Sequence, residues 1–113
     1  MISCGEPSGD VYAGALAREI LQIDRVNPKV NAIVTLVADA ARRTAARLDE
    51  EAANGRFAGP LHGLPMAHKD LQDTAGIRTT YGSPIYRDHV PERSTLMIER
   101  LQQAGAVTIG KTN

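Results

Sequence analysis

The segment from about residue 37 to residue 53 constrains the fold more than any other, because it predicts a long amphipathic helix. Small and apolar side chains recur there at steps of three and four residues and share one face: Val37, Ala40, Ala41, Thr44, Ala45, Leu48 and Ala52. Charged side chains fall mostly on the other face: Asp39, Arg42, Arg43, Asp49 and Glu50. Asn54-Gly55 should end the helix, since both residues tolerate the left-handed conformation. Such a helix usually covers one side of a larger scaffold.

Two further helices are predicted, one on each side of this segment. Helix-favouring residues run from Val11 to Val26, and Asn27-Pro28 should end that helix because the residue before a proline avoids the α region. The other helix is expected over about 95–104, with Ser94 as its N-cap. Its periodicity predicts these core-facing residues: Met97, Ile98, Leu101 and Ala104.

Short strands are predicted between the helices. Residues 64–70 should form a strand with Leu64, Met66 and His68 on one face and Ala67 and Lys69 on the other. Residues 106–109 should form a buried strand. Residues 30–36 are β-branched and apolar, although Asn31 and Ala32 weaken a strand there. Alternating helices and strands predict an α/β layer architecture.

The charge balance argues against two classes of partner. Lys plus Arg and Asp plus Glu number 13 each, so no net charge draws the chain to nucleic acid or to an anionic membrane. No apolar run approaches the roughly 20 residues that span a bilayer. The single cysteine, Cys4, excludes an internal disulfide and is typical of a reducing compartment. We therefore expect a cytoplasmic protein without nucleic-acid or membrane partners.

Two patterns that suggest ligand binding are weak. Gly105–Thr112 satisfies the G-x-x-x-x-G-K-[ST] pattern of nucleotide-binding P-loops, but its first glycine follows a predicted helix and its middle residues favour a strand. Nucleotide binding therefore ranks last among the candidate functions. The histidines lack the i, i+4 spacing of a helical zinc site, and no metal or cofactor is predicted: His62, His68 and His89.

Three blocks of sequence resemble the amidase-signature family, in the order that this family has them. The blocks are Gly59–Asp70 (GPLHGLPMAHKD), Thr79–Pro84 (TTYGSP) and Ala104–Asn113 (AGAVTIGKTN). Upstream, Arg25–Ala32 also resembles the family's N-terminal region. The resemblance spans about 23–113, and the ordered blocks make it specific where one block alone would be weak.

The resemblance implies a fold, a reaction and a catalytic residue. The fold is the N-terminal portion of an α/β/α domain around a mixed sheet, which is incomplete here. The reaction is hydrolysis of carbon–nitrogen amide bonds in a small-molecule substrate by a Ser–cis-Ser–Lys triad, with Lys69 as its lysine. The family's two serines lie beyond the block that ends at Asn113. The serines present do not match them, so we expect a truncated amidase that is inactive alone: Ser3, Ser8, Ser83 and Ser94.

The chemistry of amide hydrolysis explains why a lysine at this position would be useful. A lysine accepts a proton only when neutral, and its free pKa of about 10.4 opposes that in water. Burial lowers the pKa of a lysine by up to roughly 3–5 units. Lys69 ends an apolar strand, so its amine should emerge at the rim of a sheet, where open α/β folds bind ligands. Contact with Asp70 would raise that pKa, but adjacent strand residues point to opposite faces. From the residues alone, a lysine paired with a surface carboxylate is the alternative.

The first 20 or so residues fit the amidase-signature family poorly. Ile2–Asp10 and Val11–Leu16 resemble instead the opening strand and loop of lipid-A-disaccharide synthases, a glycosyltransferase family. We therefore divide the chain into an N-terminal segment of foreign appearance, 1–22, and a partial amidase-signature domain, 23–113. A second candidate function is a non-catalytic module that binds a partner or self-associates through the apolar faces of residues 37–53 and 95–104.

Overall fold

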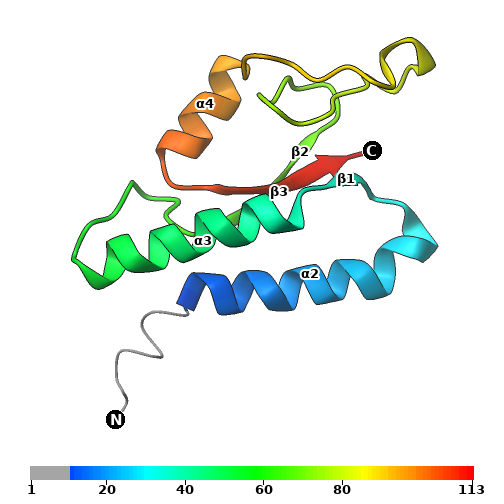
Figure 1. Cartoon of the computed structure of the whole chain (residues 1–113). Helices are drawn as coiled ribbons and strands as arrows, with labels where there is room; N and C mark the ends of the chain where they lie inside the picture. The colour runs from blue at the N-terminus through cyan, green and yellow to red at the C-terminus, as the bar shows by residue number, and fades with distance from the viewer. Residues whose placement is uncertain (1–10) are drawn as a thin grey trace.

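The computed structural model describes residues 11–113, which form an α/β structure with a three-stranded sheet (Figure 1). The elements in chain order are α2 (Val11–Val30), β1 (Ile33–Leu36), α3 (Ala38–Ala53), β2 (Pro65–Lys69), the 3₁₀ helix η1 (Pro84–Tyr86), α4 (Leu96–Gln103) and β3 (Val107–Thr112). The predicted α/β class is confirmed. The glycosyltransferase-like block at Ile2–Asp10 lies outside the described residues.

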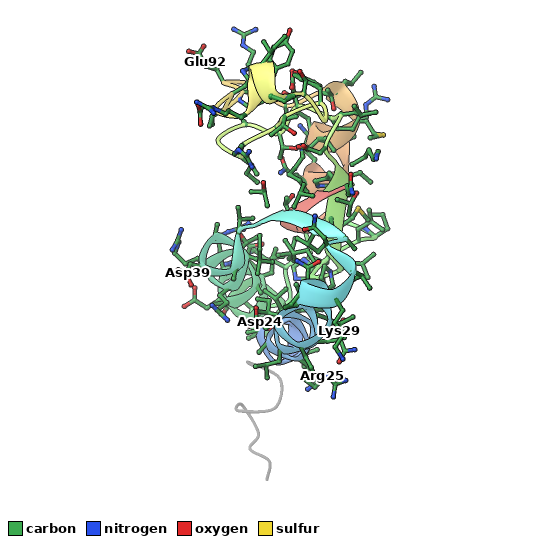
Figure 2. All side chains as sticks on the ribbon, turned by 90° about the vertical axis from the view of Figure 1, so that its right-hand side faces the viewer. Asp24, Arg25, Lys29, Asp39 and Glu92 are labelled. Atoms are coloured by element: carbon green, nitrogen blue, oxygen red, sulfur yellow. The ribbon has the colours of Figure 1, made fainter. Side chains whose placement is uncertain are left out.

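The sheet is mixed, with the strand order β1-β3-β2. β1 pairs with β3 antiparallel, and β2 pairs with β3 parallel. Helices α2 and α3 run antiparallel to each other on one side of the sheet, whereas α4 and the irregular segment after β2 lie on the other side (Figures 1 and 2). The parallel pairing puts the carboxyl ends of β2 and β3 at the same edge.

The hydrophobic core lies between the two long helices and β3. Its buried residues come from all three elements: Leu16 and Ile20 of α2, Ala41, Ala45 and Leu48 of α3, and Val107 and Ile109 of β3. The predicted helix and apolar face at 37–53 are thus confirmed in outline, although Ala40 is exposed. Ala41, Ala45 and Leu48 pack against α2 and the sheet, so this part of the face is not available to another chain.

The prediction that Asp49 of α3 lies on the polar face is wrong. Its side chain is only 1% exposed and reaches the N-terminus of α2. One carboxylate oxygen accepts a hydrogen bond from the Tyr12 N–H and the other from the Ala13 N–H, both at 2.9 Å. The first N–H groups of a helix have no partner within the helix, and a negative charge there is favourable. Asp49 therefore fastens α3 to the start of α2.

Helix α2 continues past the predicted stop at Asn27-Pro28 and ends at Val30. The proline removes only the hydrogen bond to the carbonyl of Asp24, which is exposed and can be hydrated instead. The side chain of Asn27 exchanges two hydrogen bonds with the backbone of Ile33, at 2.8 and 2.9 Å, and so holds the last turn against β1. Within residues 11–113, neither α2 nor any other helix is long and apolar enough to cross a membrane.

Helix α4 differs from its prediction in its cap and in its buried face. Thr95 is the N-cap residue, and the hydroxyl of Ser94 instead accepts a hydrogen bond from the N–H of Ala75 at 2.9 Å. Only Ile98 is fully buried, while Met97 is 51% exposed. Leu101 and Ala104 are partly buried, so Met97 is the one residue of the predicted apolar face that is exposed.

Strand β3 is longer than the predicted 106–109 and contains a β-bulge. In the pairing with β2, Met66 lies opposite Thr108 and Ala67 lies opposite Gly110, so Ile109 is an extra residue. An extra residue inverts the alternation of side chains along the rest of the strand. Lys111 consequently does not share the face of Ile109 in the core; it faces the irregular segment on the α4 side.

Candidate active site

Lys69 is the last residue of β2 and lines a cleft of about 420 Å³ at the carboxyl end of the parallel strands. Its position agrees with the prediction that its amine emerges at the rim of the sheet, and this rim is the usual ligand site of open α/β sheets. The cleft is lined by three parts of the chain: Val34, the stretch from Lys69 to Leu71, and the loop residues Arg78, Thr80–Pro84 and Arg87, with Asn113 beside them.

Asp70 is held away from the amine of Lys69, as the strand alternation predicts. It is 6% exposed, and its carboxylate accepts hydrogen bonds from the N–H of Thr80 at 3.1 and 3.2 Å and from the Thr80 hydroxyl. Among the carboxylates of residues 11–113, none forms an ion pair with Lys69. The amine is nevertheless exposed, so these residues do not themselves supply the burial that a neutral lysine requires.

The loop that forms the far wall of the cleft is fixed by its own hydrogen bonds. The Tyr81 N–H donates to the carbonyl of Asp70 at 2.9 Å, and Arg78 Nε donates to the carbonyl of Arg87. The hydroxyl of Tyr81 donates to Asp73, and this hydrogen bond, with some desolvation, raises the pKa of Tyr81 to about 12. Tyr81 therefore stays protonated at neutral pH and cannot serve as a base there.

The two serines within the described residues have structural partners. Ser83 lines the cleft, but its hydroxyl accepts a hydrogen bond from the Ile85 N–H at 3.3 Å and caps η1. The hydroxyl of Ser94 is occupied by the N–H of Ala75. Neither hydroxyl contacts a basic side chain of residues 11–113.

Lys111 is a buried charged residue that belongs to the third block of the resemblance and to the P-loop pattern, and the sequence assigned it no role. Its side chain is 0% exposed. Its ammonium donates hydrogen bonds to Thr74 Oγ1 at 2.9 Å, to Thr79 Oγ1 at 3.0 Å and to the carbonyl of Gln72. Burial lowers the pKa of Lys111, and the nearby carboxylates of Asp70 and Asp73 partly oppose this effect. As the motif Gly105–Thr112 is mostly strand β3 with a buried lysine, it does not form a P-loop.

The three histidines lie apart from one another and have separate partners. His62 accepts a hydrogen bond from the Ala58 N–H through Nδ1, so its Nε2 donates to the carbonyl of Leu48. His68 Nε2 lies 3.0 Å from the hydroxyl of Thr108, and burial together with the charge of Lys111 lowers the pKa of His68. His89 Nε2 lies 3.9 Å from Asp73. Within residues 11–113, no group of three or more His, Cys, Asp or Glu side chains is arranged to hold a metal ion.

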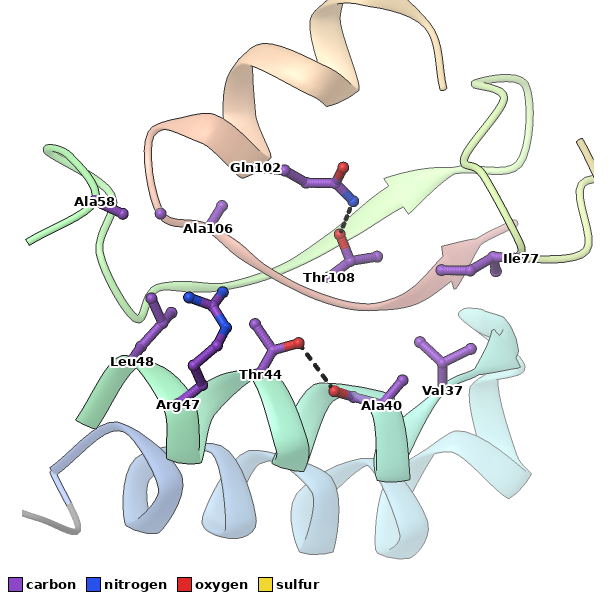
Figure 3. A pocket seen from close by; sticks show the side chains of 11 residues that line it. Val37, Ala40, Thr44, Arg47, Leu48, Ala58, Ile77, Gln102, Ala106 and Thr108 are labelled. Carbon is purple, nitrogen blue, oxygen red and sulfur yellow. Dashed lines mark hydrogen bonds between the residues drawn. The ribbon is translucent and has the colours of Figure 1, made fainter. Parts of the chain in front are cut away.

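A second hollow of about 300 Å³ lies between α3 and α4 (Figure 3). Among the described residues that line this hollow, Arg47 has the one charged side chain. The two hydroxyls of the lining already have partners: Thr44 donates to the carbonyl of Ala40, and Thr108 accepts from Gln102. It holds neither a base nor a free nucleophile. The cleft around Lys69 is therefore the better candidate for an active site.

Comparison with known sequences identifies relatives of one enzyme family. The chain matches the protein family described as Amidase over residues 15–113. It is 44% identical over 107 residues to a glutamyl-tRNA(Gln) amidotransferase subunit from Synechococcus sp. (strain CC9605), a match that covers 94% of this chain and 22% of that protein. It is 36% identical over 107 residues to an acylamidase of Rhodococcus erythropolis, again covering 94% of this chain and 22% of the relative.

Known structures agree with these sequence matches. The peptide amidase from Stenotrophomonas maltophilia superimposes with a TM-score of 0.77 at 36% sequence identity, over 93% of this chain and 21% of that one. The chain thus spans about a fifth of the length of its relatives. Since the family match extends over residues 15–113 and the fold agrees with it, this chain belongs to the amidase family.

Proposed function

We propose that this chain is the N-terminal part of a hydrolase that cleaves carbon–nitrogen amide bonds, with Lys69 as its catalytic lysine. The single observation that carries the proposal is the place of Lys69, which ends β2 at the carboxyl edge of the sheet and lines a cleft there. Asp70, the nearest carboxylate in sequence, is hydrogen-bonded to Thr80, and no carboxylate of the described part of the chain forms an ion pair with the amine.

The proposed chemistry follows from the resemblance to the amidase-signature family. A neutral Lys69 amine accepts a proton, by way of the second serine of the triad, from the serine hydroxyl that attacks the amide carbonyl. The protonated lysine returns the proton to the leaving amine as the carbon–nitrogen bond breaks, and water then hydrolyses the acyl-enzyme. The amine has to lose its solvent exposure for this role, so we propose that further parts of the family's domain cover the cleft.

A chimera tests the role of Lys69 directly. Residues 11–113 would replace the matching fifth of the Stenotrophomonas maltophilia peptide amidase, and hydrolysis of a peptide amide would be measured. Lys69→Ala should lower kcat by roughly 10²–10⁴-fold, the usual contribution of a positioned acid or base. Lys29→Ala is the matched control, because Lys29 is an exposed lysine of α2 and lies outside the cleft.

Equal activity of the Lys69→Ala and Lys29→Ala chimeras would refute the proposed role. If the first chimera is inactive as built, the acylamidase of Rhodococcus erythropolis provides a second scaffold with comparable identity. We also propose that residues 1–113 alone do not turn over amides, because the two serines of the triad are not among them. Amide turnover by the purified chain that is lost on Lys69→Ala would contradict that second statement.

A second candidate function is a non-catalytic module that self-associates. The observation that favours it is the open side of α4, where Leu96 is 61% and Met97 51% exposed beside Leu101. Analytical ultracentrifugation of the purified chain would show a concentration-dependent dimer in this case, weakened by Met97→Glu. A monomer at all concentrations would rule out self-association, and the amidase proposal would then be the one candidate function that remains.

A further inference from the structure

The ammonium of Lys111 has a complete set of hydrogen-bond partners in a buried site. Its three acceptors are Thr74 Oγ1, Thr79 Oγ1 and the carbonyl of Gln72. Each threonine hydroxyl donates its own proton to a backbone carbonyl: Thr74 donates to Gln72 and Thr79 donates to Ile77. The threonine oxygens can therefore only accept at Lys111, and three N–H donors meet three acceptors.

A neutral side chain in place of this ammonium would leave at least one of the three contacts without its N–H donor. A neutral amine has two N–H donors, and an apolar side chain has none. Buried polar atoms that lose their partner are unfavourable, and hydrogen bonds from a charged donor are stronger than neutral ones. The side chains of Lys111, Thr74 and Thr79 are all fully buried, so water does not readily take the place of the lost donor.

The acceptors of Lys111 all belong to the segment that runs from β2 to the wall of the cleft. Gln72 is one residue from Leu71, and Thr79 lies between Arg78 and Thr80; these three neighbours line the cleft around Lys69. Lys111 also lies in the sheet beside β2, the strand that ends at Lys69. The Cα of Lys111 is paired with that of His68, and the Cα of the next residue, Thr112, is paired with that of Lys69. One side chain thus joins the central strand to both ends of the 72–79 segment.

We propose that Lys111 is a positioning residue, which clamps segment 72–79 to β3 so that the wall of the Lys69 cleft is formed in advance. It would not touch the substrate, since its amine is enclosed by the segment that it holds. The inference rests on the proposed function only where it assigns the cleft a role in catalysis. The hydrogen bonds by which Lys111 holds segment 72–79 do not depend on that role.

Hydrogen exchange of the purified chain tests the clamp. In Lys111→Met, the amides of residues 72–81 should exchange about tenfold faster or more, corresponding to the loss of one charged hydrogen bond or more, while the amides of α2 and α3 keep their rates. Lys29→Met is the matched control and should change neither region. Unchanged exchange at 72–81, or an equal acceleration in α2 and α3, would overturn the proposal.

A second variant covers the case in which Lys111→Met does not fold. Thr79→Val keeps the lysine and two of its three acceptors, so the fold should survive while the same amides exchange faster. Thr44→Val, which removes a partly exposed hydroxyl from α3, is its control. If Thr79→Val leaves residues 72–81 as protected as Thr44→Val does, the clamp is refuted.

Labelling of the amines tests the connection to Lys69. The chain has three lysines, so acetylation followed by mass spectrometry assigns each site. In the wild type, Lys29 and Lys69 should react and Lys111 should be protected. Release of segment 72–79 should raise the labelling rate of Lys69 relative to Lys29, in Lys111→Met or in Thr79→Val. An unchanged ratio would show that Lys111 does not position the cleft. Labelling does not depend on amide hydrolysis, so this result would refute the role of Lys111 without refuting the catalytic role of Lys69, which the chimera tests.

Discussion

Replacing Asp49 by alanine should loosen the contact between α3 and α2, because Asp49 is the one side chain that caps the first turn of α2 from another helix within residues 11–113. The two N–H groups of Tyr12 and Ala13 would lose charged acceptors at 2.9 Å. Asp49 is only 1% exposed, so another side chain could not take its place without rearrangement of the contact between the two helices.

The magnitude follows from these two hydrogen bonds. A hydrogen bond to a charged group contributes about 1.5–3 kcal/mol, and a negative charge at a helix N-terminus contributes up to about 2 kcal/mol in partly buried geometries. The contributions overlap, and water can reach the half-buried Tyr12 and Ala13. We therefore expect Asp49→Ala to lower the free energy of unfolding by about 2–4 kcal/mol, and Asp49→Asn, which keeps one acceptor, by about half as much.

Urea unfolding followed by far-ultraviolet circular dichroism measures this loss. Asp24→Ala is the control, because Asp24 is an exposed residue of α2, and such a substitution changes stability by about 0.5 kcal/mol or less. If Asp49→Ala were no more destabilising than Asp24→Ala, the argument that a carboxylate from α3 holds the start of α2 would be refuted.

Three further predictions use the same unfolding assay. Gly110→Ala should lower the free energy of unfolding by about 1–3 kcal/mol, because its Cβ would collide with the backbone carbonyl of Thr35 in the β1–β3 pair. Gly14→Ala should raise it by up to about 1 kcal/mol, because the new Cβ meets no atom of a neighbouring segment within 4 Å among residues 11–113; equal effects of the two variants would contradict this packing. Thr35→Val should be neutral or stabilising by up to about 1 kcal/mol, since the buried Thr35 hydroxyl finds no hydrogen-bond partner among residues 11–113, and a clear loss of stability would show that it has one. Burial and the charge of Lys111 lower the pKa of His68 from 6.5, so the unfolded chain takes up this proton more readily than the folded chain, and stability should fall as the pH drops below 6.5; His68→Gln should reduce that fall, and an unchanged pH profile would contradict it.

Local patterns in the sequence predicted the elements that carry Lys69. The alternation before Lys69 and the spacing of alanines in 37–53 are properties of single segments, so they predicted β2 and α3 and the position of the lysine at the end of its strand. The ordered blocks of the amidase-signature resemblance predicted the family, which the comparisons confirm. The division of the chain after residue 22 stays a prediction, and α2 runs across that boundary without a break.

The errors fall where a residue's partner is far away in the sequence. Serine is a common N-cap residue, but the hydroxyl of Ser94 accepts a hydrogen bond from the N–H of Ala75, 19 residues earlier. The pair Asn27-Pro28 is a valid stop signal, yet the contact of Asn27 with Ile33 keeps the helix going for one more turn. The preference of a single residue for a helix end is weak, and packing against a neighbouring strand readily outweighs it.

What the sequence alone determined is the set of helices and strands with their apolar faces, because periodicity is a property of neighbouring residues. The tertiary structure decided which polar residues are buried. Asp49 is buried because the start of α2 lies over it, and Lys111 leaves the core face of β3 because the bulge at Ile109 inverts the alternation of the strand. Both outcomes depend on backbone groups of distant segments, whose hydrogen bonds have to be satisfied once the layers come together, and no local pattern contains that information.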